Sequence, residues 1–428
     1  MRKHDSVASR NFAIEEAGLI VRPWRPADAD QVFHACQDPL ILRWTSLPNP
    51  YLRHHAEGYV GELSRTGWES GTAAPMGVFD PAGRLLGAMG LISLQRGQVG
   101  EVGYWVAPWA RGRGVATHAL RAVARWAFDE LDLRRLAWRA EIGNHASRLV
   151  AETVGFRVEG IARNGAQRPG GARIDCWSGS LLPGQLREAD APLDPIRRLR
   201  GITFGAAQPR LETVTGRGDG LSLRPLRLAD VEAVTLACQD PESRRWTTVP
   251  DPYRAEDANY YVREYAPAYW ARGDGAIFAL ADDRDAFVGS MDLRLGPTAD
   301  VADVGYLVAP WARGRGYASA GLRALATWGT ARLGVNRVEW RAYVGNEASR
   351  RVAEKAGFTI EGTARAGCLQ RGEYRDAWTG ALLALDLVAD PARRPGREAP
   401  PGQFDQPDRA RRPGPPPPPG ADRPAAQS

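Results

Sequence analysis

The spacing of apolar residues changes along the chain between the two-residue period of strands and the 3.6-residue period of helices. Residues 18–22 alternate as a strand, and residues 26–36 follow as an amphipathic helix that opens with acidic residues. The pattern also predicts strands at 76–79, 85–94, 99–106 and 136–142, helices at 115–131 and 146–154, and two last strands. Strands interspersed with helices in this order predict a mixed α/β domain.

The same succession of elements occurs twice. Residues from Gly18 to about Gln167 align without a gap on residues from Gly220 to about Leu369, at a constant shift of 202 positions. The match is densest where EVGYWVAPWARGRGVA faces DVGYLVAPWARGRGYA, with 13 of 16 positions identical. Because this period is too long for a solenoid repeat, it indicates a duplicated domain. We predict an α/β (α+β) chain of two tandem domains, each with a mixed, mostly antiparallel central sheet flanked by helices.

The segments outside the repeats set the expected boundaries. We place the domains at residues 18–183 and 220–385, after a flexible N-terminus at 1–17. Residues 184–219 mix proline, glycine and charge, as a linker does, although Ile202 to Phe204 form an apolar cluster that could dock on either domain. Residues 386–428 are rich in proline and arginine and poor in large apolar side chains, so we expect a disordered or polyproline-like tail. A ligand for a proline-recognising domain is the functional alternative for this tail.

Composition narrows the compartment and the partners. Of the 428 residues, 56 are basic, but only Lys3 and Lys355 are lysines, and the net charge is +6. The arginines accompany high alanine, glycine and proline contents over the whole chain, which indicates compositional bias and disfavours a nucleic-acid partner. Four cysteines without CxxC pairing fit a reduced cytoplasm. The N-terminus lacks a signal-peptide apolar region, and no run of 18 apolar residues occurs, so neither secretion nor a membrane span is expected.

A glycine-rich turn recurs between a predicted strand and a predicted helix, at residues 111–116 and 313–318. Glycines there permit tight turns and close approach of a ligand, and the free N–H groups of the helix end attract phosphate. The structural alternative is a loop that merely caps a helix between solvated arginines. Neither turn has the lysine of a P-loop, and the third glycine of a dinucleotide fingerprint is missing. Nucleotide hydrolysis and hydride transfer are therefore disfavoured.

These motifs resemble those of the GNAT acetyltransferase superfamily, and most of all its RimJ/RimL-type branch. The family's acetyl-CoA motif, Gln/Arg-x-x-Gly-x-Gly/Ala, is matched by Arg111, Gly114 and Ala116 and by Arg313, Gly316 and Ala318. Its Asn-x-x-Ser motif, followed by a helix and Gly-Phe, is matched by Asn144 with Ser147 and by Asn346 with Ser349. The resemblance covers nearly all of both repeats.

The resemblance implies which residues hold the coenzyme. Backbone N–H groups of the two turns would bind the pyrophosphate of acetyl-CoA, and backbone groups around Val106 and Val308 would bind the acetyl-pantetheine. Asn144 and Asn346 would contact the pantetheine or the bulge of the strand. The turn residues are Arg111, Gly112, Arg113, Gly114, Val115 and Ala116 in the first repeat and Arg313, Gly314, Arg315, Gly316, Tyr317 and Ala318 in the second. No metal is implied.

The chemistry implied is direct attack of an amine on the thioester. The second repeat contains no histidine, so the base common to both repeats would be a carboxylate, from the pairs Glu101 and Asp303, Glu159 and Glu361, or Asp175 and Asp376. Ser147 and Ser349 would protonate the leaving thiolate, with a helix cap as their structural alternative. A glutamate that RimJ/RimL-type enzymes often carry is replaced here by Ala166 and Cys368, which weakens any assignment of the base or of a ribosomal acceptor.

The acceptor cleft is expected after the first helix of each repeat, where this family forms it. Trp44 and Tyr51, with Trp246 and Tyr253, would give it an aromatic wall, unless the tryptophans are rim-of-core residues. The sequence thus predicts a cytoplasmic, acetyl-CoA-dependent N-acetyltransferase acting on a small amine or a peptide N-terminus. The alternatives are a coenzyme-binding protein with one catalytic and one structural half, and nucleic-acid binding through the arginine-rich turns. The two halves are also candidates for an internal pseudo-dimer.

Overall fold

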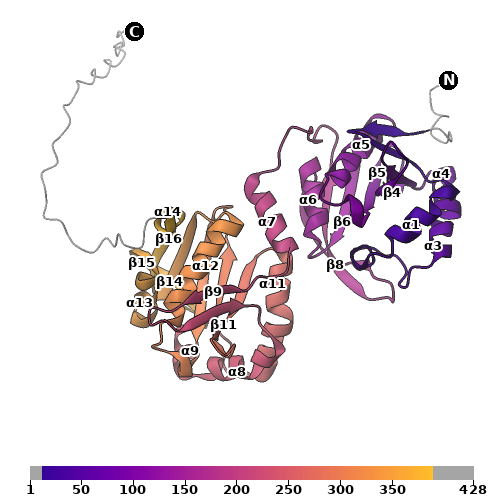
Figure 1. Ribbon diagram of the computed structural model, residues 1–428. Helices are drawn as coiled ribbons and strands as arrows, with labels where there is room; N and C mark the ends of the chain where they lie inside the picture. Colours follow the sequence, from indigo (N-terminus) through magenta and orange to yellow (C-terminus); the bar gives the residue numbers. More distant parts are fainter. Residues whose placement is uncertain (1–11, 389–428) are drawn as a thin grey trace, which may run out of the picture. The chain divides into compact units, whose positions relative to one another are not determined.

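The computed structural model describes residues 12–388, which form two eight-stranded mixed sheets with flanking helices (Figure 1). The first sheet has the order β1-β2-β3-β4-β5-β6-β8-β7. Its strands are β1 (Ile14–Glu16), β2 (Leu19–Pro23), β3 (Ala74–Phe79), β4 (Leu85–Gln95), β5 (Val99–Val106), β6 (Arg135–Glu141), β7 (Arg157–Gln167) and β8 (Arg173–Leu181). Its helical segments are η1 (Pro26–Asp28), α1 (Ala29–Ala35), α2 (Pro39–Trp44), α3 (Arg53–Gly58), the π-helical turn η2 (Tyr59–Leu63), α4 (Ser64–Ser70), η3 (Pro108–Ala110), α5 (Val115–Asp129) and α6 (His145–Val154).

The second sheet repeats this plan in the order β9-β10-β11-β12-β13-β14-β16-β15. Its strands are β9 (Leu211–Val214), β10 (Gly220–Arg224), β11 (Gly275–Asp282), β12 (Phe287–Leu295), β13 (Val301–Val308), β14 (Arg337–Tyr343), β15 (Thr359–Gln370) and β16 (Glu373–Leu383). The helical segments are η4 (Leu228–Asp230), α8 (Val231–Gln239), α9 (Pro241–Trp246), α10 (Ala255–Tyr260), the π-helical turn η5 (Tyr261–Tyr265), α11 (Ala266–Arg272), η6 (Pro310–Ala312), α12 (Tyr317–Leu333), α13 (Glu347–Ala356) and α14 (Ala384–Val388). The expected fold class is confirmed, including the mostly antiparallel sheets.

One pair of strands in each sheet is parallel and only briefly bonded. β5 pairs with β6 from Val99↔Arg135 to Glu101↔Ala137, and β13 pairs with β14 from Val301↔Arg337 to Asp303↔Glu339. Both strands of each pair continue beyond these residues without pairing to each other, so the sheet splits at this point. Because unpaired backbone groups then face the gap, the split provides hydrogen-bonding partners for a bound ligand.

The long helix of each domain covers the sheet beside the split. α5 buries Leu120, Val123 and Trp126 in the first core, and α12 buries Leu322, Leu325 and Trp328 in the second. These apolar positions recur every three residues, which places them on one face of the helix. Burial of this stripe fixes the first turn of each helix against the end of the preceding strand.

The ends of the domains differ from the sequence expectation. β1 lies inside the segment expected to be a flexible N-terminus. This part of the segment is a strand because it pairs with β2 from Ile14↔Val21 to Glu16↔Leu19. The expected linker contains a helix, α7 (Pro195–Gly205), and β9, which completes the second sheet by pairing with β10. The Ile202 to Phe204 cluster lies on α7, where Thr203 Oγ1 donates to the Arg332 carbonyl of α12 at 2.7 Å. The proline-rich tail lies outside the described residues from 389 onward, as do residues 1–11.

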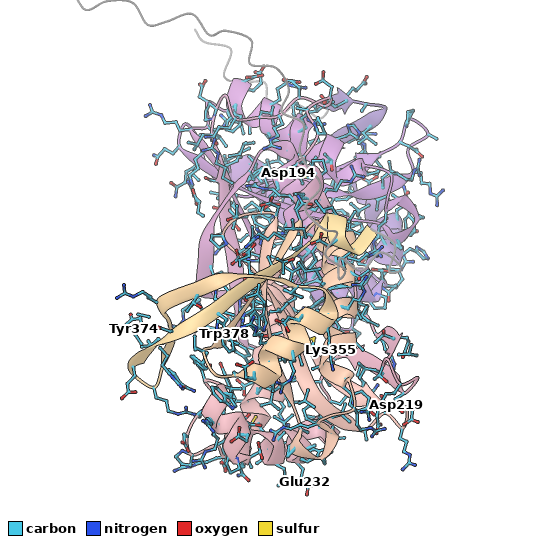
Figure 2. All side chains as sticks on the ribbon, turned by 90° about the vertical axis from the view of Figure 1, so that its left-hand side faces the viewer. Asp194, Asp219, Glu232, Lys355, Tyr374 and Trp378 are labelled. Atoms are coloured by element: carbon cyan, nitrogen blue, oxygen red, sulfur yellow. The ribbon has the colours of Figure 1, made fainter. Side chains whose placement is uncertain are left out.

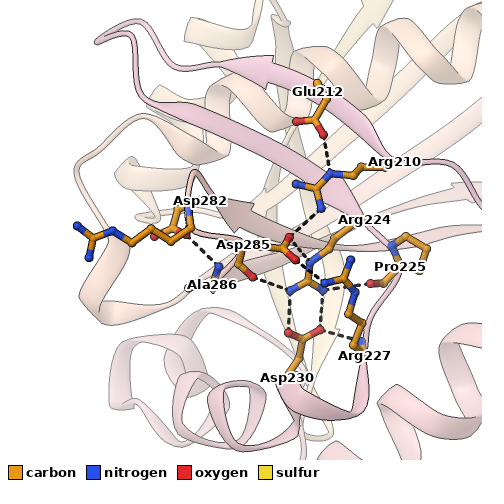
Figure 3. Close-up of polar contacts among 10 residues, drawn as sticks. Arg210, Glu212, Arg224, Pro225, Arg227, Asp230, Asp282, Asp285 and Ala286 are labelled. Atoms are coloured by element: carbon orange, nitrogen blue, oxygen red, sulfur yellow. Dashed lines mark hydrogen bonds and ion pairs between the residues drawn. The ribbon is translucent and has the colours of Figure 1, made fainter.

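A buried ion-pair network ties β10 of the second domain to the start of α8 (Figure 3). Arg224 on β10 is 2% exposed and donates to both carboxylate oxygens of Asp230 at 2.8 and 2.9 Å. Its Nε donates to Asp285 at 2.9 Å, and Asp285 also pairs with Arg210 and Arg227. In the first domain the corresponding pair is Arg22 with Asp28. Because these charges are buried, the loss of either partner would leave the other charge buried without compensation.

The last two strands of the second domain form a hairpin that extends outward, with Tyr374 at its tip and Trp378 closer to the sheet (Figure 2). None of the helices within residues 12–388 combines the length and the hydrophobicity that a membrane span requires.

Candidate functional site

The glycine turns lead directly into the long helices. Gly112 and Gly114 have φ of 73° and 75°, and Gly314 and Gly316 have φ of 78° and 87°. This left-handed conformation favours glycine because it carries no Cβ. Gly114 and Gly316 are the N-cap residues of α5 and α12, and neither helix end receives a side-chain cap. The first N–H groups of both helices, from Val115 and Tyr317 onward, therefore lack a capping side chain, as an anion site at a helix N-terminus requires.

The motif arginine of each turn binds the aspartate at the start of a short helix, α2 in the first domain and α9 in the second. Arg111 donates to Asp38 at 2.5 and 3.2 Å, and Arg313 pairs with Asp240 at 2.5 Å. Each aspartate also caps a short helix, Asp38 that of α2 and Asp240 that of α9. The Arg111 guanidinium lowers the pKa of Asp38, so this carboxylate is ionised near neutral pH. The same bridge in both domains joins the glycine turn to the short helix that follows α1 or α8.

Three polar side chains meet in the split of each sheet. In the second domain, Trp340 Nε1 donates to Ser349 Oγ at 3.2 Å and to the Tyr306 hydroxyl at 3.1 Å, and the two hydroxyls lie 2.8 Å apart. Burial raises the pKa of Tyr306 to about 12, so this phenol stays protonated at neutral pH.

The first domain has the same trio. Ser147 Oγ donates to the Tyr104 hydroxyl at 3.0 Å and accepts from Trp138 Nε1 at 3.1 Å. Sequence reasoning named the serines but missed the tyrosines and tryptophans. Their presence at matching positions of both repeats was the available signal.

Asn144 and Asn346 lie one turn before these serines. Each side-chain oxygen accepts from the serine backbone N–H at 3.1 Å, which makes the asparagines the N-caps of α6 and α13. The asparagine of the family motif therefore fixes where the serine hydroxyl lies, and its amide NH₂ remains for a ligand.

A cavity of about 1180 Å³ runs through the second domain along these features. At one end it is lined by Gly314, Gly316, Tyr317 and Ala318 of the turn, and in the middle by Val308, Asn346 and Ser349. At the other end it reaches Trp246, Tyr253 and Asp303. The structure thus brings most of the second-domain residues named from sequence into one continuous space. Arg113 of the first domain borders a separate recess of about 260 Å³ with His118.

The candidate carboxylates do not all lie in this space. Asp303 lines the cavity and pairs with Arg294, and its first-domain counterpart Glu101 pairs with Arg139 at 2.8 Å. Glu361 is not among the lining residues, because it lies on β15 in a two-bond ion pair with Arg337.

Glu159 occupies the equivalent place on β7. It is bonded to Arg135 and to Ser180 Oγ, and these bonds hold its pKa at about 2. A carboxylate with so low a pKa is a weak base.

Asp175 and Asp376 each accept a hydrogen bond from a backbone N–H of the neighbouring strand. Asp175 Oδ1 accepts from the Asn164 N–H at 2.8 Å, and Asp376 Oδ1 accepts from the Ala366 N–H at 2.8 Å. Both donors have positive φ and lie where the last two strands shift register. These aspartates hold the irregular strand in place. Asp376 is not among the residues that line the second-domain cavity.

The aromatic pairs divide into buried and rim residues. Tyr51 and Tyr253 are 3% and 7% exposed and belong to the apolar cores beside the helices. Trp44 carries the Arg43 guanidinium over its ring, and Trp246 donates from Nε1 to Glu242 at 2.9 Å. The tryptophans therefore lie at the surface of the domain, while the tyrosines belong to the buried core. Trp246 and Tyr253 both line the second-domain cavity.

The two domains close the acceptor side differently. In the first, Glu141 at the end of β6 binds Arg43 of α2 and Arg168 of the β7–β8 hairpin, and these guanidiniums lower its pKa against the effect of burial. In the second, the corresponding positions hold Tyr343 and Gln370, and the Gln370 amide donates to the Arg245 and Thr247 carbonyls. The clamp built on the Glu141 carboxylate in one domain is thus replaced in the other by amide bonds of Gln370, whose Oε1 accepts from Arg375 at 2.7 Å.

Comparison with known proteins matches the family description "Acetyltransferase (GNAT) domain" at residues 18–157 and again at 221–359. The chain is 44% identical to a putative ribosomal N-acetyltransferase, YdaF, of Bacillus subtilis over 84 residues, which are 19% of this chain and 46% of that protein. It is 27% identical to an uncharacterized N-acetyltransferase, YoaA, of the same organism over 169 residues, 39% of this chain and 93% of the relative. The chain spans about half the length of the first curated relatives that it matches.

Among solved structures, RimJ of Mycobacterium smegmatis in complex with CoA-disulfide is 23% identical and has a TM-score of 0.39, over 42% of this chain and 90% of that one. Each family match spans the split strands and the glycine turn of one sheet and ends at the start of β7 or β15. The chain therefore belongs to the GNAT acetyltransferase family and contains two tandem domains of it.

Proposed function

We propose that this protein is an acetyl-CoA-dependent N-acetyltransferase that transfers an acetyl group directly to a primary amine. The observation that carries the proposal is the uncapped helix N-terminus behind a left-handed glycine turn, beside split strands, in both domains. Free N–H groups and the positive end of the helix suit a pyrophosphate. The unpaired edges of β5 and β13 near Val106 and Val308 suit an amide-rich chain such as pantetheine, and a backbone N–H there would polarise the thioester carbonyl.

In this reaction the amine nitrogen attacks the thioester carbon, the new C–N bond forms and the C–S bond breaks. The attacking nitrogen loses one proton, which balances the charge of the departing thiolate. With a pKa of about 12, Tyr306 is too weak an acid to give up its proton to a thiolate of ordinary pKa, about 8.5. Each phenol donates its proton to the backbone carbonyl of the serine, Tyr306 at 3.1 Å and Tyr104 at 2.9 Å. We therefore assign the hydrogen bond to the sulfur to the Ser349 hydroxyl, and to the Ser147 hydroxyl in the first domain.

Acetyl-CoA titration by calorimetry, combined with release of free thiol in the presence of amine-containing antibiotics, polyamines and N-terminal peptides, tests this function. We expect two binding sites for each chain and thiol release with at least one amine class. Absence of acetyl-CoA binding, or binding without thiol release for every amine, would contradict the proposal.

A second candidate is a protein in which only the second half is catalytic. The Arg43–Glu141–Arg168 clamp on the acceptor side of the first domain favours this candidate. In the second domain Tyr343 replaces the Glu141 carboxylate and Gln370 replaces the Arg168 guanidinium. Two coenzyme sites with turnover from only one of them would support this candidate.

Replacing Ser349 by alanine is expected to lower the kcat of the second domain by about 10²-fold, toward the lower limit of what the loss of one positioned hydrogen-bond donor costs. Alanine keeps the backbone N–H that Asn346 caps, so α13 retains its start. The affinity for acetyl-CoA should change by less than about threefold. Thr235→Ala is the control, because that hydroxyl returns to its own helix at Val231. An unchanged kcat would remove Ser349 from the reaction.

A further inference from the structure

The acceptor end of the second-domain cavity contains a carboxylate that the sequence did not single out. Asp292 lies on β12 and faces Gly305 of β13 in the strand register. Any Cβ at position 305 would collide with Asp292 Oδ1, so the glycine gives this carboxylate its place on the floor of the cavity. The Asp292 side chain is 21% exposed, and the rest of its surface is covered by protein.

The charges around Asp292 are not balanced. Arg294 Nη1 lies 3.2 Å from Asp292 Oδ2, but the Nε of the same guanidinium binds Asp303. One positive charge is thus shared between two carboxylates that line the same space. Burial, with a contribution from Asp303, raises the pKa of Asp292 in spite of Arg294. Of the other cations that line the cavity, Arg313 is paired with Asp240 and Arg341 with Glu339. Arg351 and Lys355 also line the cavity, on α13.

Tyrosines from the π-helical turn form the opposite wall. Tyr261 and Tyr265 stack with their rings 6.1 Å apart, and both line the cavity. Burial, with a contribution from Asp292, raises the pKa of Tyr261, so this ring stays neutral. Neutral aromatic faces beside a net negative charge favour a cation with an aliphatic stem.

The first domain keeps Tyr59 and Glu101 at the positions aligned with Tyr261 and Asp303, but it lacks the other residues of this group. Gly90 stands where the second domain has Asp292, and a Cβ there would collide with the Ala74 carbonyl of β3, so no side chain fits. Ile92, which is 60% exposed, lies over Gly103 instead. Leu63 and Gly67 replace Tyr265 and Tyr269. The floor of the first cleft is therefore apolar and uncharged at this place.

We infer that the second domain selects acceptors that carry a further positive charge beside the amine that is acetylated, as an aliphatic diamine does, and that Asp292 binds this charge. The first domain lacks the selectivity, so the two halves act on different acceptors. This inference rests on the proposed function. Asp292 is thereby a specificity-determining residue. Its negative charge is only partly neutralised, because Arg294 also pairs with Asp303.

The test uses the full chain with the first coenzyme site removed by Gly114→Asp. Acetyl transfer to 1,4-diaminobutane and to n-butylamine is compared before and after Asp292→Asn. We expect the starting protein to prefer the diamine by at least about tenfold in kcat/KM, and the substitution to reduce that preference to less than about threefold, chiefly through KM. Glu232→Gln is the matched control, because Glu232 points outward from α8, away from the cavity (Figure 2). It should leave the preference unchanged.

Each remaining outcome is decisive. Equal turnover of the diamine and the monoamine, or a loss of the same size for both in Asp292→Asn, would overturn the inference while leaving the proposed function intact. Acetyl-CoA binding without transfer to any amine would instead contradict the proposed function. If Asp292→Asn lowers the melting temperature by more than the control does, Asp292→Glu, which keeps the charge, should restore the diamine preference.

Discussion

Replacing Asp230 by asparagine is expected to destabilise the second domain by about 3 kcal/mol, because it leaves a buried guanidinium without its main counter-charge. Arg224 is 2% exposed and makes two of its bonds to this carboxylate (Figure 3). Asparagine keeps the shape and an acceptor oxygen, so the loss is that of charge. Asp285 remains beside Arg224 but is shared with Arg210 and Arg227, so it offsets only part of the loss.

Denaturant titration followed by hydrogen-exchange mass spectrometry measures this effect, because peptides from β10 and β2 report on the two domains separately. Two controls bracket it. Arg227→Met removes an exposed partner of Asp285 and should cost less than about 1 kcal/mol. Asp28→Asn breaks the equivalent pair of the first domain, where Arg22 is more exposed than Arg224, and should cost less than Asp230→Asn. A loss for Asp230→Asn no larger than that for Arg227→Met would refute the network's role.

Replacing Gly114 or Gly316 by aspartate is expected to weaken acetyl-CoA binding at the altered site by about 10³-fold, or about 4 kcal/mol. Aspartate is among the few side chains that tolerate the left-handed conformation. Its carboxylate would compete for the helix N–H groups and repel a pyrophosphate. The nearest atoms to a Cβ at these positions lie 3.2 Å away, on His118, and 3.6 Å away, on Thr215, so a side chain fits with small adjustments.

Calorimetry of the two single variants and the double variant gives the result as a stoichiometry, which should fall from two to one and then to none. Gly83→Asp is the control, because Gly83 has φ of 81°, a Cβ there would meet nothing within 4 Å, and it lies in the turn between β3 and β4. It carries the same backbone strain without touching the coenzyme turn. Undiminished binding at both altered turns would place the coenzyme elsewhere.

The repeat in the sequence predicted the strands and helices of the sheets well, and its motifs predicted a glycine turn before each long helix. The helices after α1 were not predicted, because α2, α3 and α4 are short and their apolar residues do not complete a clear period. β9 was read as linker since its four residues carry no strand pattern of their own and gain their bonds only from β10. Local patterns reveal elements that bury a regular stripe, and they miss those that tertiary contacts hold.

The candidate site shows the same division. Gly114 and Gly316 could be assigned from sequence, because a left-handed turn before a helix restricts the residue type locally. The carboxylates could not be ranked, because Glu159, Asp175 and Asp303 look alike along the chain and differ only in their partners: an arginine with a serine, a backbone N–H, and the arginine beside Asp292.

By itself, the sequence determined that the chain holds two copies of one α/β domain, each with a glycine turn between a strand and a long helix. Only the tertiary structure decided which acids reach the cavity and how the two acceptor sides differ, because burial and charge pairing depend on strands that are distant in sequence and adjacent in the sheet.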